Sequence, residues 1–266
     1  MSVQERKQGF SIGRSRIRPW AFIRAYNEIH TAEQSLRSIE GVIEHGVIAY
    51  HDCSDGTEDV ILQFCKRNPG FIPAKYPYRV LRPDSPELVR GDYLYEESLA
   101  AYYTFALSHI PPKEWLIKVD LDLVFSPDLL DASFYLPQTP SDWVSYSRLN
   151  IADLDGDVGL LDYVRPGDHF LVRNDALKFV NTRWVDRRTG KVYYHESLRH
   201  KKFLCYCPEC SVLHFPFHKS WRRANSLTGF RPLSDIADIV PTSERDDAFL
   251  CPENIERIFK SLRSLD

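Results

Sequence analysis

The sequence has no long apolar run, because no stretch of its 266 residues approaches the roughly 20 apolar residues of a membrane-spanning helix. The first residues also lack the apolar core of a secretory signal peptide, so we expect a cytoplasmic protein. A net charge of -3 gives no overall attraction to nucleic acid, and we expect no nucleic-acid partner. These absences favour a globular protein of the cytoplasm.

A glycine-rich, basic phosphate loop is missing after the first apolar segment, Trp20–Ile23. The residues that follow, Arg24–Thr31, contain no glycine. Nucleotide-sugar pyrophosphorylases and other nucleotidyltransferases usually carry such a loop close to their first strand. The sequence therefore disfavours that class of enzyme, although it too combines a metal with an α/β sheet.

Disulfide bonds are not expected, because six cysteines in a chain of this size without a signal peptide are typical of reduced thiols. Hydrophobic residues make up 43% of the chain and aromatic residues 13%, which is typical of a globular protein with a large core. We expect one domain over residues 19–266, preceded by a short tail over residues 1–18. The sequence leaves the oligomeric state open.

The tail is basic, with the residues Arg6, Lys7, Arg14, Arg16 and Arg18. Most tails of this kind are solvated and poorly ordered. A short basic cluster also provides weak attraction to an anionic membrane surface. Peripheral association with the inner face of the membrane therefore stays open.

Apolar segments of strand length alternate with amphipathic segments of helical period in the first half of the chain. We expect helices from Thr31, where Thr31 and Gln34 have capping-box spacing, and over residues 57–67 and 94–110. We expect strands over residues 20–23, 47–50, 78–81 and 115–125. Alternation of this kind predicts an α/β fold, a Rossmann-like, mostly parallel central sheet flanked by helices.

Polar residues follow the predicted strands at their carboxyl ends, which meet at one edge of a parallel sheet. We expect this edge to carry Arg24, Asn27, Asp52, Asp55, Asp120 and Asp122. Singly, each residue is more often a turn or cap residue. Their convergence on the edge where such sheets bind ligands favours a binding site.

The most strand-like segment, Trp115–Phe125, carries two carboxylates near its end, Asp120 and Asp122. Carboxylate oxygens suit Mg²⁺ or Mn²⁺, which take their remaining ligands from substrate phosphates and water. His214 follows a strand-like Val212-Leu213 and is a candidate ligand for the same cation, with a hydrogen-bonded core histidine as the ordinary alternative. Further on, Arg222, with Lys219 and Arg223, is placed to neutralise a departing diphosphate or forms a solvated basic face.

Two other groups of residues in the second half have metal-like spacing. Cys205, Cys207, Cys210 and His214 offer zinc a tetrahedral soft-ligand set, but the first two cysteines are unusually close for a structural site, so zinc is the minor alternative. The acidic residues Asp153, Asp155, Asp157 and Asp162 lack the length and terminal glutamate of a calcium loop, which predicts a solvated turn.

Several segments between residues 19 and 219 carry a resemblance to a known family. They are Pro19–Arg24, Gly46–Ile48, Asp52–Cys53, Asp55–Gly56, Phe71–Pro73, Lys75–Tyr78, Glu114–Lys118, Val144–Arg148, Pro166–Asp168 and His214–Phe217. In this order they resemble the bacterial β-1,4-N-acetylgalactosaminyltransferases of glycosyltransferase family 12, which build lipooligosaccharide. The segment Asn174–Cys210 resembles that family only loosely, and it is where acceptor contacts would lie.

The resemblance implies a GT-A fold with a nucleotide-binding half over residues 19–125 and an acceptor-binding half over residues 126–266. It implies inverting transfer from UDP-GalNAc to an oligosaccharide or glycolipid acceptor, with Mn²⁺ or Mg²⁺ held by Asp122 and His214. The expected nucleotide-sugar contacts are Arg24, Asn27, Asp52, Asp55, Asp120 and Arg222. Glu196 is the first choice for the catalytic base and Asp168 the second, with an exposed ion pair as the ordinary role for Glu196.

Two alternatives stay open. Transfer of galactose, glucose or N-acetylglucosamine by the same machinery is the nearest, because donor choice depends on a few contacts around the sugar. A non-catalytic module that binds zinc or carbohydrate would keep the fold and lose the chemistry.

Overall fold

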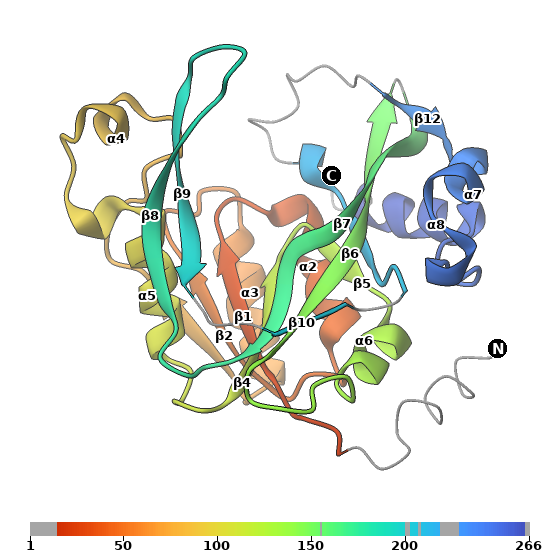
Figure 1. The fold of residues 1–266 in the computed structure, drawn as a ribbon, viewed down its shortest axis with the longest axis horizontal. Coiled ribbons are helices and arrows are strands. Elements are labelled where there is room, and N and C mark those ends of the chain that lie inside the picture. The colour runs from red at the N-terminus through yellow and green to blue at the C-terminus, as the bar shows by residue number, and fades with distance from the viewer. Residues whose placement is uncertain (1–14, 155, 200–202, 207–208, 219–228, 264–266) are drawn as a thin grey trace.

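The computed structural model describes residues 15–154, 156–199, 203–206, 209–218 and 229–263 (Figure 1). A curled mixed sheet forms its centre, in the strand order β3-β2-β1-β4-β7-β6-β11-β5. Strand β10 also pairs with β6, and β12 with β7. Within these ranges no helix has the length and hydropathy to cross a membrane.

The first half of the sheet is parallel. It consists of β1 (Trp20–Ala25), β2 (His45–Tyr50), β3 (Phe71–Lys75) and β4 (Trp115–Asp120). Alternate residues of β1 point to opposite faces, because side chains in a strand have a period of two. Ile23 packs against α2 (Ile29–Ile39) and α3 (Thr57–Arg67), whereas Phe22 packs against α5 (Leu99–Ser108).

The second half of the sheet is mixed. Two long strands, β6 (Asp142–Leu154) and β7 (Asp157–Arg173), form an antiparallel hairpin, and β7 runs antiparallel to β4. The short strands are β5 (Leu123–Phe125), β10 (Phe203–Tyr206), β11 (Val212–His214) and β12 (Arg231–Pro232). Helices α7 (Ile236–Ile239) and α8 (Pro252–Arg263) cover a separate apolar cluster on this half, and α6 (Pro127–Ser133) follows β5.

A two-stranded hairpin, β8 (Lys178–Val185) and β9 (Val192–Arg199), rises away from the sheet (Figure 1). Its base packs on α5 and β1: the Phe179 ring lies against Tyr103 of α5, with 4.9 Å between centroids, and stacks on Phe22 of β1 at 5.7 Å. Helix α4 (Pro86–Arg90) lies beside β9. The short 3₁₀ turns are Tyr95–Glu97, Pro216–His218, Leu233–Asp235 and Thr242–Glu244.

The structure confirms the α/β class and corrects several element positions. The third strand is Phe71–Lys75, and residues 78–81 form no strand, so that prediction is wrong. Strand β3 contains Pro73 and pairs only with β2, at the edge of the sheet. Proline is tolerated on an edge strand because one side of that strand needs no N–H donor.

Three other boundaries differ from the predictions. Helix α2 begins at Ile29, two residues before the proposed capping box, and α5 begins at Leu99, where the Ser98 hydroxyl accepts a bond from Ala101 N at 3.2 Å. The run 115–125 is two strands, because the chain turns at Leu121-Asp122 and β5 then pairs antiparallel with β11. Asp162 lies within β7, not in a solvated turn.

Candidate functional site

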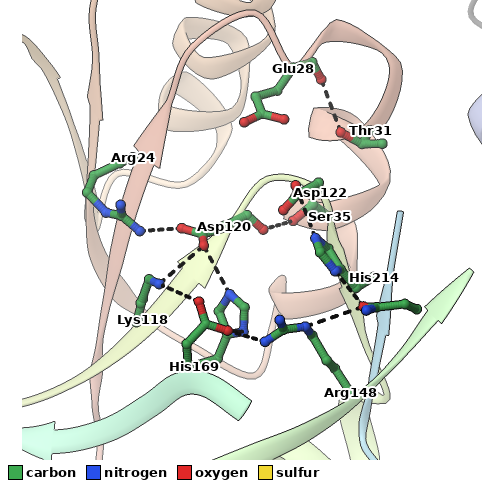
Figure 2. A network of polar contacts seen from close by, with 12 residues as sticks. Arg24, Glu28, Thr31, Ser35, Lys118, Asp120, Asp122, Arg148, His169 and His214 are labelled. Atoms are coloured by element: carbon green, nitrogen blue, oxygen red, sulfur yellow. Dashed lines mark hydrogen bonds and ion pairs between the residues drawn. The ribbon is translucent and has the colours of Figure 1, made fainter. Parts of the chain in front are cut away.

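The two carboxylates of the Asp-x-Asp segment lie at the centre of the sheet, where β4 ends (Figure 2). Asp120 is the last residue of β4, and Asp122 occupies the turn that leads into β5. The Asp122 carbonyl accepts a hydrogen bond from Phe215 N at 2.9 Å, which fixes this turn against the end of β11. Asp122 is only 3% exposed, so its carboxylate is held in a low-dielectric environment.

Basic side chains surround Asp120. Arg24, at the end of β1, donates to one carboxylate oxygen, and Lys118 Nζ lies 3.5 Å from the other, which also bonds with His169 Nε2 at 3.0 Å. Burial alone would raise the pKa of Asp120, but Arg24, Lys118 and the His169 bond hold it well below its usual value. Asp120 is therefore a permanent anion whose charge is neutralised by the protein itself.

Arg24 is fixed on two sides. Its guanidinium lies over the Tyr103 ring, 3.5 Å from the centroid, as well as against Asp120. Burial lowers the pKa of Arg24, but Asp120 together with Tyr103, Glu196 and Tyr102 offsets this, and the net shift is upward. Arg24 therefore acts here as a buried counter-charge that fixes the end of β1 to the end of β4.

His169 was not singled out by the sequence analysis, although it follows Asp168 directly. Its side chain is 3% exposed, and burial lowers its pKa, so the ring is neutral at pH 7. A carboxylate only accepts hydrogen bonds, so the neutral ring donates Nε2–H to Asp120. His169 thus supports Asp120 from below the site (Figure 2).

Asp168 belongs to the same network. It accepts a bond from Arg148, and its other oxygen lies 3.4 Å from Lys118 Nζ. Burial would raise the pKa of Asp168, but the charge of His169, which is protonated at low pH, and the charges of Lys118 and Arg148 lower it well below its usual value. A carboxylate with so low a pKa is a weak proton acceptor, although the side chain is 62% exposed at the surface of the site.

His214 and Asp122 approach each other across the turn, with His214 Nε2 3.3 Å from Asp122 Oδ2. The other ring nitrogen, Nδ1, lies 2.6 Å from Asn150 Oδ1. The Asn150 amide is oriented by Asp162, which accepts from its nitrogen at 2.6 Å. The amide oxygen therefore faces His214 and accepts Nδ1–H.

This orientation decides which His214 nitrogen carries the proton. In the neutral ring Nδ1–H is engaged by Asn150, so Nε2 presents its lone pair toward the Asp122 carboxylate. A carboxylate and an imidazole lone pair directed at each other form the donor pair that a divalent cation accepts, and a second hydrogen bond that fixes the tautomer is typical of histidine ligands.

The donor set fits Mn²⁺ or Mg²⁺ with few protein ligands. Among the described residues, no group of three or more His, Cys, Asp or Glu side chains is arranged to hold a metal. Asp120 is already neutralised by Arg24 and Lys118, which leaves Asp122 and His214 as the metal candidates. Such a site suits a cation that takes its other ligands from phosphates and water.

Glu196, the expected base, lies on β9 opposite Asn181. It reaches the site from the hairpin side, because its carboxylate interacts with Tyr103 and Arg24. Burial raises the pKa of Tyr103 well above its usual value, Arg24 acts in the opposite direction, and Glu196 raises it further. Tyr103 therefore stays protonated beside Glu196.

The loops after β1 and β2 hold the other predicted contacts. Asn27 Oδ1 accepts from Ser54 N at 2.8 Å, which joins the two loops, and the exposed Asp52 lies 3.7 Å from His51 Nδ1. Asp55 has a structural role, since it accepts bonds from Ile29 N, Thr57 N and the Thr57 hydroxyl at 3.1, 3.0 and 2.6 Å. These bonds fix the starts of α2 and α3.

Some of the predicted residues lie outside the described part of the chain. These are Arg222 and its neighbours Lys219 and Arg223, together with Cys207 and the side chain of Cys205. Cys210 is described, and it is fully buried in the core, where burial raises its pKa to about 12. Cys210 belongs to an apolar core cluster, and its Sγ lies 3.9 Å from Ser147 O and 3.7 Å from Val212 O, which favours a core role for this residue over the zinc alternative.

A family model described as "Beta-1,4-N-acetylgalactosaminyltransferase (CgtA)" matches residues 8–236. The chain belongs to this family. Membership in the CgtA family confirms the expected resemblance, and the sheet topology agrees with the expected α/β architecture. Comparison with curated protein sequences finds no match.

Solved structures that resemble this member of the CgtA family include two glycosyltransferases. One is a mannosyltransferase from Pyrobaculum calidifontis in complex with GDP-Man and Mn²⁺, with 16% identity and a TM-score of 0.38 over 54% of this chain and 41% of that chain. Another is glucosyl-3-phosphoglycerate synthase from Mycobacterium tuberculosis with Mn²⁺ and UDP, with 14% identity and a TM-score of 0.35 over 56% of this chain and 48% of that chain. The chain therefore spans less than half the length of each.

Sequence reasoning placed the Asp-x-Asp carboxylates and His214 of this CgtA-family protein but missed the side chains that orient them. Those are Lys118, Arg148, Asn150, Asp162 and His169. Lys118 carried a signal, since a lysine in the middle of a buried strand requires a charged partner. Asn150 and His169 carried none, because β6 and β7 are joined by a register that only the structure shows.

The Asp120 network makes the fold sensitive to acid. Because the folded pKa of Asp120 lies far below its unfolded value near 4, its contribution is present above about pH 4 and is lost as the pH falls below that. We expect Asp120→Asn to lower the free energy of unfolding at pH 7 by about 3 kcal/mol, because Arg24 and Lys118 lose their counter-charge. The free energy of unfolding of this variant also falls less steeply than that of wild type as the pH is lowered below about 4.

Urea unfolding of both proteins between about pH 2 and pH 7 measures this difference. Asp59→Asn, on the exposed surface of α3, is the matched control and keeps the wild-type slope. Parallel loss of stability in wild type and Asp120→Asn below pH 4 would show that Asp120 is not the titrating group.

Proposed function

We propose that the protein is an inverting glycosyltransferase that moves N-acetylgalactosamine from UDP-GalNAc to a galactose-containing lipooligosaccharide or surface glycan. Mn²⁺ or Mg²⁺ is the cofactor. The family supplies the reaction class. The observation that carries the mechanism is the position of His214, whose Nδ1 lies 2.6 Å from Asn150 Oδ1 and whose Nε2 lies 3.3 Å from Asp122 Oδ2.

The proposal divides the chain between its two substrates. Residues 19–125 form the nucleotide-binding half, with the nucleoside over Arg24, Asn27 and Asp52, and residues 126–266 form the acceptor half. The position of Asp120 supports a contact with the ribose or sugar, since one carboxylate oxygen has only the Arg24 bond among the described side chains. The bonds to Asp55 favour a role in fixing the loops beside the nucleoside rather than in contacting it. Arg222 is the proposed contact to the diphosphate.

The two carboxylates of the Asp-x-Asp segment have different tasks in this mechanism. Asp122 and His214 would hold the divalent cation, which when bound would supply positive charge against the diphosphate. Asp120 stays paired with Arg24 and Lys118 and keeps β1 and β4 in register beside the donor. Because Arg24 and Lys118 are engaged by Asp120, they are not available to neutralise the leaving group.

Glu196 is the better supported base. An inverting enzyme takes the proton of the acceptor hydroxyl on the face of the sugar opposite the leaving group, and a carboxylate suits that role. Asp168 is engaged by Arg148 and Lys118, and its low pKa makes it a weak base. In the proposal Glu196 accepts the proton of the acceptor hydroxyl, and Asp168 positions the sugar or the side chains of Arg148 and Lys118.

Release of UDP from a panel of UDP-sugars tests the proposed function directly. We expect release from UDP-GalNAc in the presence of Mn²⁺, and its loss in EDTA and in Asp122→Ala, because the leaving diphosphate then has no cation against it. Asp59→Ala is the matched control and retains turnover. If no UDP-sugar is turned over, with or without galactose-terminated acceptors, the protein is not a UDP-sugar transferase. If UDP is released only from UDP-Gal or UDP-GlcNAc, that sugar nucleotide is the donor in place of UDP-GalNAc.

The base assignment predicts a separate effect on turnover. Glu196→Gln keeps the size of the side chain but removes the proton acceptor, so we expect kcat to fall by roughly 10²- to 10⁴-fold with little change in the donor KM. Steady-state kinetics with a galactose-terminated acceptor measures both constants. If Asp168→Asn abolishes kcat while Glu196→Gln retains it, Asp168 is the base instead.

A further inference from the structure

The outer end of the β8–β9 hairpin, residues 183–193, is basic and aromatic. Trp184 is 51% exposed and pairs across the strands with Tyr193, with 5.6 Å between the ring centroids. Around this pair lie the basic residues Arg183, Arg187, Arg188 and Lys191 and one carboxylate, Asp186. We call residues 183–193 the hairpin tip.

The single carboxylate of the hairpin tip is used within the turn. Asp186 accepts from Arg188 N and from the Thr189 hydroxyl, both at 2.8 Å, and its carbonyl accepts from Gly190 N at 2.8 Å. Gly190 has a φ of 69°, which suits glycine at this position of the turn. The turn is therefore ordered by its own bonds, with the two adjacent arginines exposed beside it.

The hairpin tip is also held in place against the rest of the fold. Lys191 Nζ lies 2.7 Å from Asp84 and 5.1 Å from the Tyr193 ring centroid, and Tyr194 N donates to Pro83 O at 2.8 Å. No ion pair occurs between Arg183, Arg187 or Arg188 and any carboxylate of the described residues. The hairpin projects from the rest of the fold (Figure 1), and its tip carries three arginines without an ion pair among the described residues, beside the exposed Trp184.

We propose that the hairpin tip docks on an anionic phospholipid surface. Tryptophan and tyrosine favour the interface between headgroups and water, and arginines near them are attracted to anionic lipids. A glycan site is usually concave with converging polar groups, whereas the hairpin tip projects outward. The charge and shape together match a flat anionic membrane.

Docking in this way places the proposed base at a defined height above the lipid. Glu196 lies four residues after Val192, where β9 begins. With a rise of about 3.4 Å per residue, Glu196 is roughly 14 Å from the turn along the hairpin. A lipid-linked oligosaccharide would then extend along the hairpin toward Glu196; this last step rests on the proposed function, whereas membrane docking does not.

Vesicle co-sedimentation of the full chain, without donor or metal, tests the docking alone. We expect wild type to bind phosphatidylcholine vesicles that contain phosphatidylglycerol, to bind pure phosphatidylcholine weakly, and to dissociate as salt is raised. Arg187→Glu/Arg188→Glu lowers the partition coefficient by roughly 30-fold or more, because each arginine near an anionic surface contributes about a factor of five. Trp184→Ala lowers it by a smaller factor at every lipid composition.

Two matched variants separate the hairpin tip from other basic regions. Lys178→Glu/Arg199→Glu makes the same charge change at the base of the same hairpin, and Arg6→Glu/Lys7→Glu makes it in the basic tail. Both keep more affinity than the tip variant if the proposal holds, with circular dichroism confirming that each variant is folded. The proposal is overturned if wild type binds no anionic vesicle or if the tip variant binds these vesicles as wild type does. It is also overturned if the tip variant differs from wild type in binding a soluble glycan but not in binding vesicles.

Discussion

The hydrogen bond between His214 and Asn150 is the contact on which the proposed chemistry depends. It engages Nδ1–H and directs the Nε2 lone pair at Asp122. Asn150 itself is oriented by Asp162 on the neighbouring strand, so the β6–β7 hairpin sets the protonation pattern of a residue on β11. Without this chain of bonds, His214 would be free to donate Nε2–H to the Asp122 carboxylate. That hydrogen bond would compete with a cation for both side chains.

Around this contact, two carboxylates one residue apart acquire opposite electrostatic environments. Asp120 points to the Arg24 side and is neutralised by protein cations, whereas Asp122 points to the His214 side (Figure 2). The turn between β4 and β5 produces this division, because it sends the two side chains toward different strands. The parallel half of the sheet thus presents a structural ion pair, and the mixed half presents the proposed metal ligands.

Much of this site was predictable from the sequence, because strand length, β-branched residues and terminal acids are local signals. The local pattern placed Arg24, Asp120, Asp122 and His214 at the ends of strands. It failed at the third strand, which is Phe71–Lys75 and not residues 78–81, because only the position of β3 at the sheet edge shows that Pro73 is tolerated there. It also failed at Asn150, Asp162 and His169, because the pairing of two strands more than ten residues long determines what these side chains contact, and no local pattern encodes that register.

In the proposed mechanism, Asp122 and His214 hold a divalent cation whose other ligands come from the nucleotide. Titration of Mn²⁺ followed by electron paramagnetic resonance, with and without UDP, tests it most directly. We predict that Mn²⁺ binds weakly to the protein alone and more tightly when UDP is present. His214→Ala removes a ligand and Asn150→Leu removes the acceptor for Nδ1–H, so each lowers the Mn²⁺ affinity by roughly 10-fold or more. Mn²⁺ affinity in the presence of UDP that is the same in wild type and both variants would contradict the account.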